Sequence, residues 1–575
     1  MRFLGDYSMM KFCDIASRNE LADFLEISRK QLTYVLYVKK VDSYYKSFDI
    51  PKKNGDVRTI NAPTDDLKYI QKQLAKALQE YQIDIWNSHK VKPNISHGFE
   101  KRKSIITNAK VHRNKKYVLN LDLEDFFDSF HFGRVRGFFE KNRNFALPLE
   151  VATIIAQLTC FKGSLPQGAP TSPVITNLVC RILDNRLLRI SKKYKLDYTR
   201  YADDLTFSTN NKSFLDFKDE FFLAINKEIQ HAGFKINANK TRLSYKDSKQ
   251  TVTGLIVNKK INVDQKYYRK TKSMAHSLYT KGKFTIDGQT GTIEQLEGRF
   301  SFINQLDWYN NKLDNQPHEF GTLTGRERIF KRFLFYKYFY GNNTPIIVTE
   351  GKTDVRYLKS ALKSLYQEYP NLISKTKDGK FEFKISFLKR TKRLQYFLNI
   401  RLDGADTIQN IYKYFVDGKA RERKKYPNYF SYFLQSGIPP HMPVVLLFDN
   451  ELESKRPLRK FLTDQNFTDE QIEELRNNLY LKILKNGNLF LLTNPLIPGK
   501  KECEIEHLFS EETLSHQIDG KKLCLKDNYD IKKYYGKEIF SHYVLSDFKN
   551  IDFTGFRPLL DKLNLIVTSY SSNSV

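Results

Sequence analysis

The sequence is poor in cysteine and has no long apolar run. It contains five cysteines and no C-x-x-C pair, so we expect neither a disulfide framework nor a cysteine-based zinc site. No apolar stretch reaches the roughly 18 residues that a membrane-spanning helix needs. The N-terminus also lacks the apolar block of a signal peptide. We therefore expect a soluble cytoplasmic protein with reduced thiols and no membrane partner.

The sequence shows no internal repeats and no flexible linkers. Acidic residues are fewer than basic ones. The 575 residues hold 95 Lys and Arg against 65 Asp and Glu, a net charge of +30. Residues 1–340 carry 58 basic and 36 acidic side chains, and residues 341–575 carry 37 and 29. This excess favours a polyanionic partner, with nucleic acid ahead of a membrane surface. With 40% hydrophobic residues, the chain can form several packed domains.

The hydrophobic pattern changes partway along the chain. Residues 116–127 begin as a buried strand within a mixed α and β region, and residues 266–340 are mostly helical and basic. Apolar strands then alternate with helices, beginning with residues 344–365 and including a second strand in residues 441–451. That alternation is typical of a parallel α/β sheet. The change predicts a domain boundary near residues 315–343.

A first set of carboxylates lies at a strand end and a turn. Asp122 ends the apolar run YVLNL, and Asp203 and Asp204 form a turn between two strand-like runs about 80 residues later. Such carboxylates can converge on two divalent metals that activate a 3′-hydroxyl and steady a leaving pyrophosphate. Mg²⁺ prefers oxygen ligands, so we expect a two-metal magnesium site.

The surrounding residues resemble the motifs of reverse transcriptases. Residues 201–204 (YADD) resemble the YxDD box, residues 165–173 (LPQGAPTSP) the LPQGxxxSP loop, and residues 122–127 (DLEDFF) the first palm motif. Their order and spacing also agree. The resemblance implies an α+β right-hand polymerase with fingers, palm and helical thumb. It makes Asp122 and Asp203 metal ligands, with Asp204 beside them.

The same resemblance assigns roles around the deoxynucleotide substrate (dNTP). Phe127 would lie under its sugar and exclude a 2′-hydroxyl, while Gln167 and Gly168 would lie along the nascent base pair. Lys53 and Arg58 resemble the pair that binds the triphosphate, although a surface charge is an alternative for each. Lys240 is a candidate proton donor to pyrophosphate or, alternatively, a solvated lysine.

Two short elements narrow the resemblance to retron reverse transcriptases. Residues 108–112 (NAKVH) fit the NAxxH element of that family, and residues 252–254 fit its VTG triplet. A group II intron type of enzyme is the main competitor. The retron resemblance implies a bacterial cytoplasmic enzyme that binds a cognate structured non-coding RNA. It would prime from a 2′-hydroxyl of that RNA and copy part of it into multicopy single-stranded DNA, with an oligomer of protein and RNA–DNA as one possibility.

A second set of acids follows two apolar strands of the C-terminal region. Glu350 closes the first strand, Asp354 comes four residues later, and Asp449 and Glu451 follow the second strand. The carboxyl ends of parallel strands meet at one edge of a sheet. These four residues are therefore candidate ligands for one or two Mg²⁺ ions.

This arrangement resembles a Toprim domain, a Rossmann-like α/β fold, and is closer to the OLD-like nucleases than to topoisomerases or primases. The second acid of the usual DxD pair is here Glu451, and Glu506 is either an additional ligand or a surface acid. The resemblance implies a Mg²⁺-dependent nuclease that cuts RNA (including tRNA) or DNA as the toxic effector of an anti-phage system. A non-catalytic nucleic-acid-binding module and a maturation enzyme for the retron's own RNA or DNA are alternatives.

Both resemblances together predict a series of domains along the chain. The expected parts are N-terminal helices and fingers (1–115), palm (116–262), thumb (263–320), connector (321–343), and a Toprim domain (344–575) with an insert at about 370–440.

Overall fold

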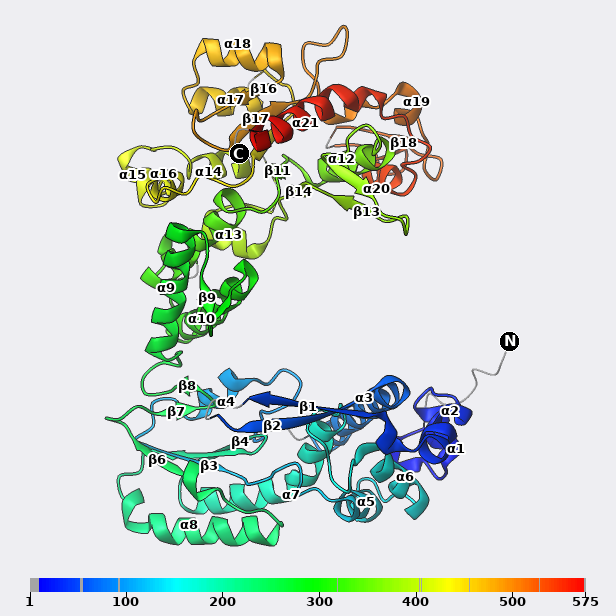
Figure 1. The fold of residues 1–575 in the computed structure, drawn as a ribbon, viewed down its shortest axis with the longest axis vertical. Coiled ribbons are helices and arrows are strands. Elements are labelled where there is room, and N and C mark those ends of the chain that lie inside the picture. The colour runs from blue at the N-terminus through cyan, green and yellow to red at the C-terminus, as the bar shows by residue number, and fades with distance from the viewer. Residues whose placement is uncertain are drawn as a thin grey trace. The chain divides into compact units, whose positions relative to one another are not determined.

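The computed structural model describes residues 10–572, apart from residues 52–54, 91–93, 318, 403, 405, 455 and 527. The chain divides into two compact units, Met1–Gln265 and Lys266–Val575, which are described separately (Figure 1). All five cysteines are free. Across the described residues, no helix combines the length and apolar character that crossing a bilayer requires.

The first unit is built from helices around a small antiparallel sheet. Its helices are α1 (Arg18–Phe24), α2 (Arg29–Thr33), α3 (Asp65–Ser88), α4 (Ile105–Val111), α5 (Phe132–Lys141), α6 (Leu149–Thr159), α7 (Ser172–Lys193) and α8 (Phe214–His231). Its strands are β1 (Tyr45–Pro51), β2 (Val57–Pro63), β3 (Tyr117–Asp122), β4 (Asp197–Tyr201), β5 (Asp204–Thr209), β6 (Arg242–Tyr245), β7 (Thr251–Val252) and β8 (Leu255–Ile256).

The central sheet of this unit has the strand order β4-β5-β3-β6, and every neighbouring pair is antiparallel. Apolar side chains of α7 and α8 share one hydrophobic core with β3 and β5, for example Leu187, Phe221, Leu121 and Phe207. β1 and β2 form a separate two-stranded hairpin around the predicted Asn54–Gly55 turn, of which Asn54 lies outside the described residues. The sheet thereby presents the end of β3 beside the turn between β4 and β5.

The second unit contains a mostly parallel sheet with helices on both faces. Its helices are α9 (Gln265–Lys281), α10 (Ile293–Leu313), α11 (Gly325–Phe335), α12 (Lys352–Ser364), α13 (Lys392–Leu398), α14 (Asp406–Tyr412), α15 (Ala420–Arg423), α16 (Tyr429–Leu434), α17 (Pro457–Asp464), α18 (Asp469–Asn478), α19 (Glu511–Leu514), α20 (Lys537–Ser546) and α21 (Arg557–Ser572). Its strands are β9 (Thr285–Ile286), β10 (Gln289–Thr290), β11 (Ile346–Val348), β12 (Ile373–Lys375), β13 (Phe381–Phe383), β14 (Ser386–Phe387), β15 (Val444–Phe448), β16 (Tyr480–Lys482), β17 (Leu489–Thr493), β18 (Lys522–Leu523) and β19 (Tyr534–Tyr535).

The five-stranded sheet of this unit has the order β14-β11-β15-β17-β16, with β16 alone antiparallel to its neighbour. Alternate residues of β15 enter two different cores, Leu446 on one face and Val445 and Leu447 on the other. Burial on both faces explains why the strand is a continuous apolar run. The core that contains Leu446 also includes Leu278 of α9 and Phe300 of α10, so residues 266–340 pack with the C-terminal half of the chain.

Candidate active sites

Three carboxylates gather at one end of the antiparallel sheet of the first unit. Asp122 is the last residue of β3 and pairs directly with Asp204, the first residue of β5. Residues paired in this way place their side chains on the same face, about 5 Å apart at Cβ. Asp203 lies in the turn between β4 and β5, and its carbonyl accepts a hydrogen bond of 3.1 Å from the Leu123 amide. Strand register therefore brings the three predicted acids together.

The turn that carries Asp203 is supported by a buried ion pair that sequence reasoning missed. The guanidinium of Arg200 donates two hydrogen bonds of 2.9 Å to Asp184 of α7, and both side chains are buried. A third donation reaches the carbonyl of Ala202 at 3.2 Å. Ala202 has a φ of +56°, and a Cβ on Gly98 would come within 2.7 Å of its amide. An acid on an otherwise apolar helix face was the available signal for Asp184.

The NAxxH element contacts the same two strands, β4 and β5, through the side chains of Asn108 and His112. His112 has its ring nitrogens 2.7 Å from the hydroxyl of Thr199 on β4 and 2.7 Å from that of Ser208 on β5. Thr199 also donates to the side chain of Asn108 at 2.6 Å. Burial lowers the pKa of His112 to about 3, so the ring is neutral at physiological pH. Asn108 and His112 therefore position the hairpin of β4 and β5.

The carboxylate cluster repels itself electrostatically. Burial, followed by the charges of Asp203 and Asp122, raises the pKa of Asp204 to about 7. Burial and Asp122 also raise the pKa of Asp203, while Lys240 and Arg58 act in the opposite direction. Lys240 donates a hydrogen bond of 2.7 Å from Nζ to Asp122, and this contact raises the pKa of the lysine. An additional cation at the acids would relieve the repulsion.

The donor set has the chemistry of a magnesium site, because its side-chain ligands are all carboxylate oxygens. The described residues nevertheless contain no group of three or more His, Cys, Asp or Glu side chains that could hold a metal ion.

The predicted nucleotide-binding residues lie on elements near this cluster. Phe127 is half-buried and packs edge-to-face on Phe126, with ring centroids 5.4 Å apart. The carbonyl of Gln167 accepts a hydrogen bond of 2.8 Å from Asn61 of β2. Gly168 has a φ of +121°, and a Cβ there would come within 2.9 Å of the Asn61 carbonyl. The loop therefore docks against the strand that carries the exposed Arg58, whereas Lys53 lies outside the described residues.

The second set of predicted acids meets at the carboxyl edge of the parallel sheet. Glu350 follows β11 and Asp449 follows β15, which is the neighbouring strand. The carboxylate of Glu350 accepts a hydrogen bond of 3.0 Å from the amide of Asp449. The carboxylate of Asp449 accepts one of 2.9 Å from the amide of Ile505 and one of 2.7 Å from Asn494. These contacts lock two acids that are about 100 residues apart in the sequence.

The charges of Asp354 and Glu506 also act on this pair of acids. Burial raises the pKa of Glu350 to about 7, with further contributions from Asp354 and Glu451. Burial and then the charges of Glu350, Asp354 and Glu506 raise the pKa of Asp449 well above its usual range. Asp354 also accepts a hydrogen bond of 2.8 Å from the amide of Gly351 at the start of α12. Asp354 therefore acts on both members of the buried pair, Glu506 acts on Asp449, and Glu451 acts on Glu350.

Glu451 also has a cationic partner, which is Arg456. Its carboxylate accepts a hydrogen bond of 2.5 Å from Arg456, which also contacts Glu504 at 2.8 Å. Lys537 of α20 bridges Glu504 and the buried Glu506 at 3.0 and 3.2 Å. Arg456 and Lys537 were not found from the sequence, because neither belongs to a recognisable motif. This cluster also consists of oxygen donors, as a magnesium site requires.

Comparison with known proteins places these observations in a family. Residues 50–262 match the family model described as reverse transcriptase (RNA-dependent DNA polymerase). The chain is 32% identical over 327 residues to the retron Mx162 reverse transcriptase of Myxococcus xanthus, an alignment of 51% of this chain and 64% of that protein. It is 33% identical over 294 residues to the retron Ec86 reverse transcriptase of Escherichia coli, an alignment of 50% of this chain and 85% of that protein.

The chain thus spans slightly less than two thirds of the first of these relatives, at 64% of its length. Among solved structures, apo telomerase from Candida tropicalis aligns at a TM-score of 0.30 and 14% identity, over 50% of this chain and 60% of that one. A TM-score at that level carries no argument about this protein.

Proposed function

Because this chain belongs to the retron reverse transcriptase family, we propose that it is an RNA-directed DNA polymerase that makes multicopy single-stranded DNA. Its template would be part of a cognate structured non-coding RNA, and its primer a 2′-hydroxyl of that RNA. The observation that carries the proposal is the meeting of Asp122, Asp203 and Asp204 at one end of the sheet. Family membership decides between the two classes of reverse transcriptase that the motifs left open.

In this proposal each group near the cluster has a separate task. Asp122, Asp203 and Asp204 would hold two Mg²⁺ ions, which when bound activate the 3′-hydroxyl and steady the pyrophosphate. Lys240, already hydrogen-bonded to Asp122, would give a proton to the leaving pyrophosphate. The half-buried ring of Phe127 would exclude the 2′-hydroxyl of a ribonucleotide.

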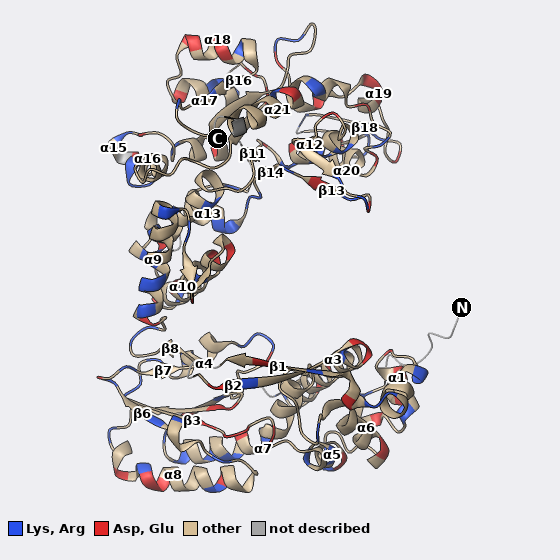
Figure 2. Cartoon of the chain, in the orientation of Figure 1, with Lys and Arg blue, Asp and Glu red and all other residues tan. Residues whose placement is uncertain are grey.

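The nucleic acid needs basic surface as well as a catalytic site. Helix α9 contains several Lys and Arg residues and no acidic residue, and Figure 2 shows this basic helix in the second unit. Arg299 of α10 lies over the ring of Tyr267 at 4.0 Å. Basic and aromatic side chains in this combination suit phosphate contacts and base stacking. They support a role of α9 and α10 in holding RNA.

The polymerase proposal is tested by Asp203→Asn with Asp204→Asn. Purified protein is given a primed RNA template, dNTPs and Mg²⁺, and DNA synthesis is expected to fall by a factor of about 1,000 or more, because the metal-binding carboxylates are lost. The matched control is Asp216→Asn with Asp219→Asn, which neutralises two exposed acids of α8. Equal DNA synthesis by the two double variants would refute the proposal.

We further propose that the C-terminal region is a Mg²⁺-dependent nuclease of the Toprim type that serves as the toxic effector in anti-phage defence. Its support is the contact between Glu350 and Asp449 at the carboxyl edge of adjacent parallel strands. Asp354 and Glu506 would complete the ligand set, with Glu451 beside them. RNA, including tRNA, and DNA are both candidate substrates.

This second proposal is tested by Glu350→Ala, with Glu382→Ala on the exposed part of β13 as control. We expect Glu350→Ala to abolish Mg²⁺-dependent cleavage of a mixed tRNA, single-stranded RNA and DNA substrate pool, and to leave DNA synthesis intact. Cleavage that persists in Glu350→Ala and in Asp449→Ala would refute it.

A nucleic-acid-binding or assembly module without catalysis is the alternative for the C-terminal region. That alternative predicts that the purified wild-type protein cleaves nothing in the pool. If the C-terminal region is instead a maturation enzyme, replacing Glu350 should change the length of the retron's own DNA and should have no effect on cell growth.

A further inference from the structure

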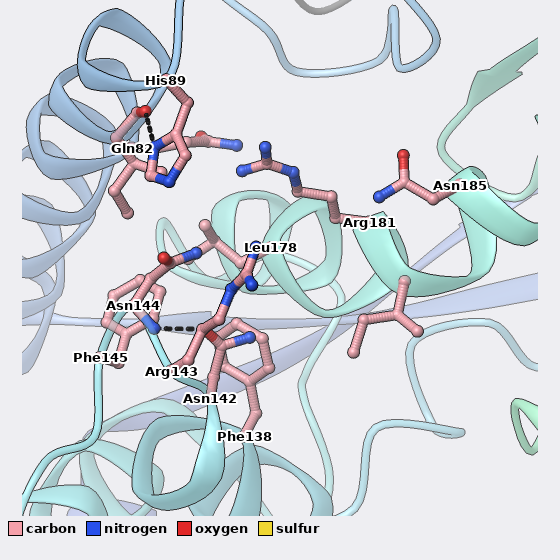
Figure 3. Close-up of a pocket in the computed structure, with 12 residues that line it drawn as sticks. Gln82, His89, Phe138, Asn142, Arg143, Asn144, Phe145, Leu178, Arg181 and Asn185 are labelled. Atoms are coloured by element: carbon pink, nitrogen blue, oxygen red, sulfur yellow. Dashed lines mark hydrogen bonds between the residues drawn. The ribbon is translucent and has the colours of Figure 1, made fainter. Parts of the chain in front are cut away.

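The first unit contains a pocket that shares no residue with the carboxylate cluster. It encloses about 170 Å³ between the C-terminal part of α3, the loop from α5 to α6, and α7 (Figure 3). Two guanidinium groups, those of Arg143 and Arg181, belong to its lining, and His89 lies at its α3 side. None of its lining residues is acidic.

The two arginines have no anionic partner in the described part of the chain. Arg143 is exposed and Arg181 is half-buried, and no ion pair is formed by either. Burial lowers the pKa of Arg181, and the positive charge of Arg143 lowers it further. Two like charges around a partly buried space are unfavourable unless an anion enters. The planar guanidinium fork matches the geometry of a phosphate.

The remaining lining suits more than a bare phosphate ion. Phe138, Phe145 and Leu178 form apolar parts of the wall, and side-chain amides such as those of Gln82 and Asn185 add hydrogen-bonding groups. Unstacked nucleic-acid bases are recognised by this combination of aromatic or guanidinium planes with amide groups. The lining therefore fits a nucleotide unit rather than a lone ion.

Basic residues continue from the pocket along the same helix. Leu178, Arg181 and Asn185 of α7 line the pocket, and at helical spacing the same stripe continues to Arg189 and Lys192, both exposed. A free nucleotide would use the pocket alone. A strand carries a phosphate on each successive residue and would also use the basic stripe.

We infer that this pocket binds one nucleotide of the single-stranded RNA, with its phosphate between Arg143 and Arg181, and so anchors the RNA at a site separate from the carboxylate cluster. The choice of RNA as the occupant rests on the proposed retron function. The affinity for a phosphate follows from the two unpaired guanidinium groups and is independent of that function.

The test compares the full-length wild type with Arg143→Gln plus Arg181→Gln. Binding of a fluorescent single-stranded RNA of mixed sequence is measured by anisotropy at several salt concentrations. We expect RNA affinity to fall by a factor of about 10, and the slope of log affinity against log salt to fall by about 0.7 for each lost phosphate contact. The rate of DNA synthesis on a saturating DNA-primed RNA template should stay unchanged.

The matched control is Lys212→Gln with Lys227→Gln, which removes one positive charge just before α8 and one within it, both at exposed positions. Equal affinity and salt slope in the two double variants would overturn the inference. Arg143→Lys with Arg181→Lys keeps the charge and should recover part of the affinity, which separates loss of contact from misfolding.

A second arm distinguishes the strand from a free anion. Inorganic phosphate and adenosine monophosphate are titrated against the wild type and against Arg143→Gln plus Arg181→Gln. Binding of either probe that disappears in the variant while RNA affinity stays unchanged would overturn the RNA assignment. Loss of RNA binding in the variant, together with no DNA synthesis by the wild type, would leave the pocket assigned and refute only the polymerase proposal.

Discussion

The two carboxylate clusters of this protein differ in what holds them together. In the first unit, Asp122 and Asp204 are paired by the register of an antiparallel sheet, and backbone hydrogen bonds at Leu123 and Asn237 fix the adjoining segments. In the second unit, the carboxylates themselves make the joining contacts, from Glu350 to the amide of Asp449 and from Asp449 to that of Ile505. Backbone pairing alone places Asp122 opposite Asp204, whereas the acids of the second cluster also need hydrogen bonds from their own carboxylates.

The difference has a consequence for mutation. Removing a carboxylate of the first cluster should remove chemistry and leave the sheet in place, because the backbone pairing persists. In the second cluster, the same change removes both a candidate ligand and a structural hydrogen bond. The lysines of the two clusters differ as well. Lys240 of the first cluster is largely exposed, whereas Lys537 of the second cluster lies between Glu504 and Glu506.

The largest expected effect concerns the support of the first cluster. Arg200→Met would leave Asp184 buried without its ion-pair partner, which costs about 3–5 kcal/mol of folding free energy. Thermal unfolding of the full chain should show the loss. Arg200→Met with Asp184→Leu should recover most of it, because an apolar pair avoids the buried charge. A melting temperature equal to that of the exposed control Arg189→Met would contradict the prediction.

Lys240 tests whether the exposed cation of the first cluster does chemistry. Lys240→Met should lower kcat for DNA synthesis about 100-fold, equivalent to about 2.7 kcal/mol, since a positioned proton donor is removed. Primer–template affinity should change little. Lys235→Met is the control, because that exposed lysine pairs with Glu124. A smaller than threefold loss would assign Lys240 an electrostatic role only.

Glu350 tests the cost of burying a charged carboxylate in the second cluster. Its pKa of about 7 lies above the ordinary value, so its contribution to stability is present at low pH and is lost as pH rises through about 7. Without divalent metal, Glu350→Gln should therefore be more stable than the wild type by about 3 kcal/mol at pH 8 and by less than about 1 kcal/mol at pH 5. Melting temperatures in EDTA across this pH range measure it. A constant difference at all pH values would rule out the titration of Glu350 as the cause.

The smallest expected effect is at the edge of the second cluster. Arg456 pairs with Glu451 and Glu504 but its side chain is 54% exposed. Arg456→Ala should therefore cost only about 0.2–1 kcal/mol in thermal unfolding, with a smaller cost at high salt. If Arg456→Ala lost as much stability as Arg200→Met, the exposed ion pairs of Arg456 would support the second cluster as strongly as the buried pair of Arg200 and Asp184 supports the first.

Much of the fold is visible in the sequence where the signal is local. The apolar runs predict β3, β11 and β15. The last two are apolar throughout because each is buried on both faces. The short motifs also predict the turn at Ala202 and Asp203, because a two-residue hairpin connects adjacent strand segments. The placement of Asp122 opposite Asp204 follows once those two strands pair.

Other parts of the sites depend on contacts between distant segments. The pairing of Arg200 with Asp184, the approach of Lys537 to Glu506 and the pocket around Arg181 each join side chains from separate elements. Apart from Asp184, which interrupts an otherwise apolar helix face, nothing in the local pattern distinguishes these residues from solvated charges on helices and strands.

The sequence alone therefore determined the strands that carry the acids, the turns beside them and the identity of most candidate acids, because backbone geometry imposes short-range periodicity on apolar and polar residues. Only the tertiary structure decided which cation meets which acid, and that α9 and α10 share a core with the C-terminal sheet. Those choices depend on the packing of surfaces far apart along the chain, and any apolar helix face is compatible with many such partners.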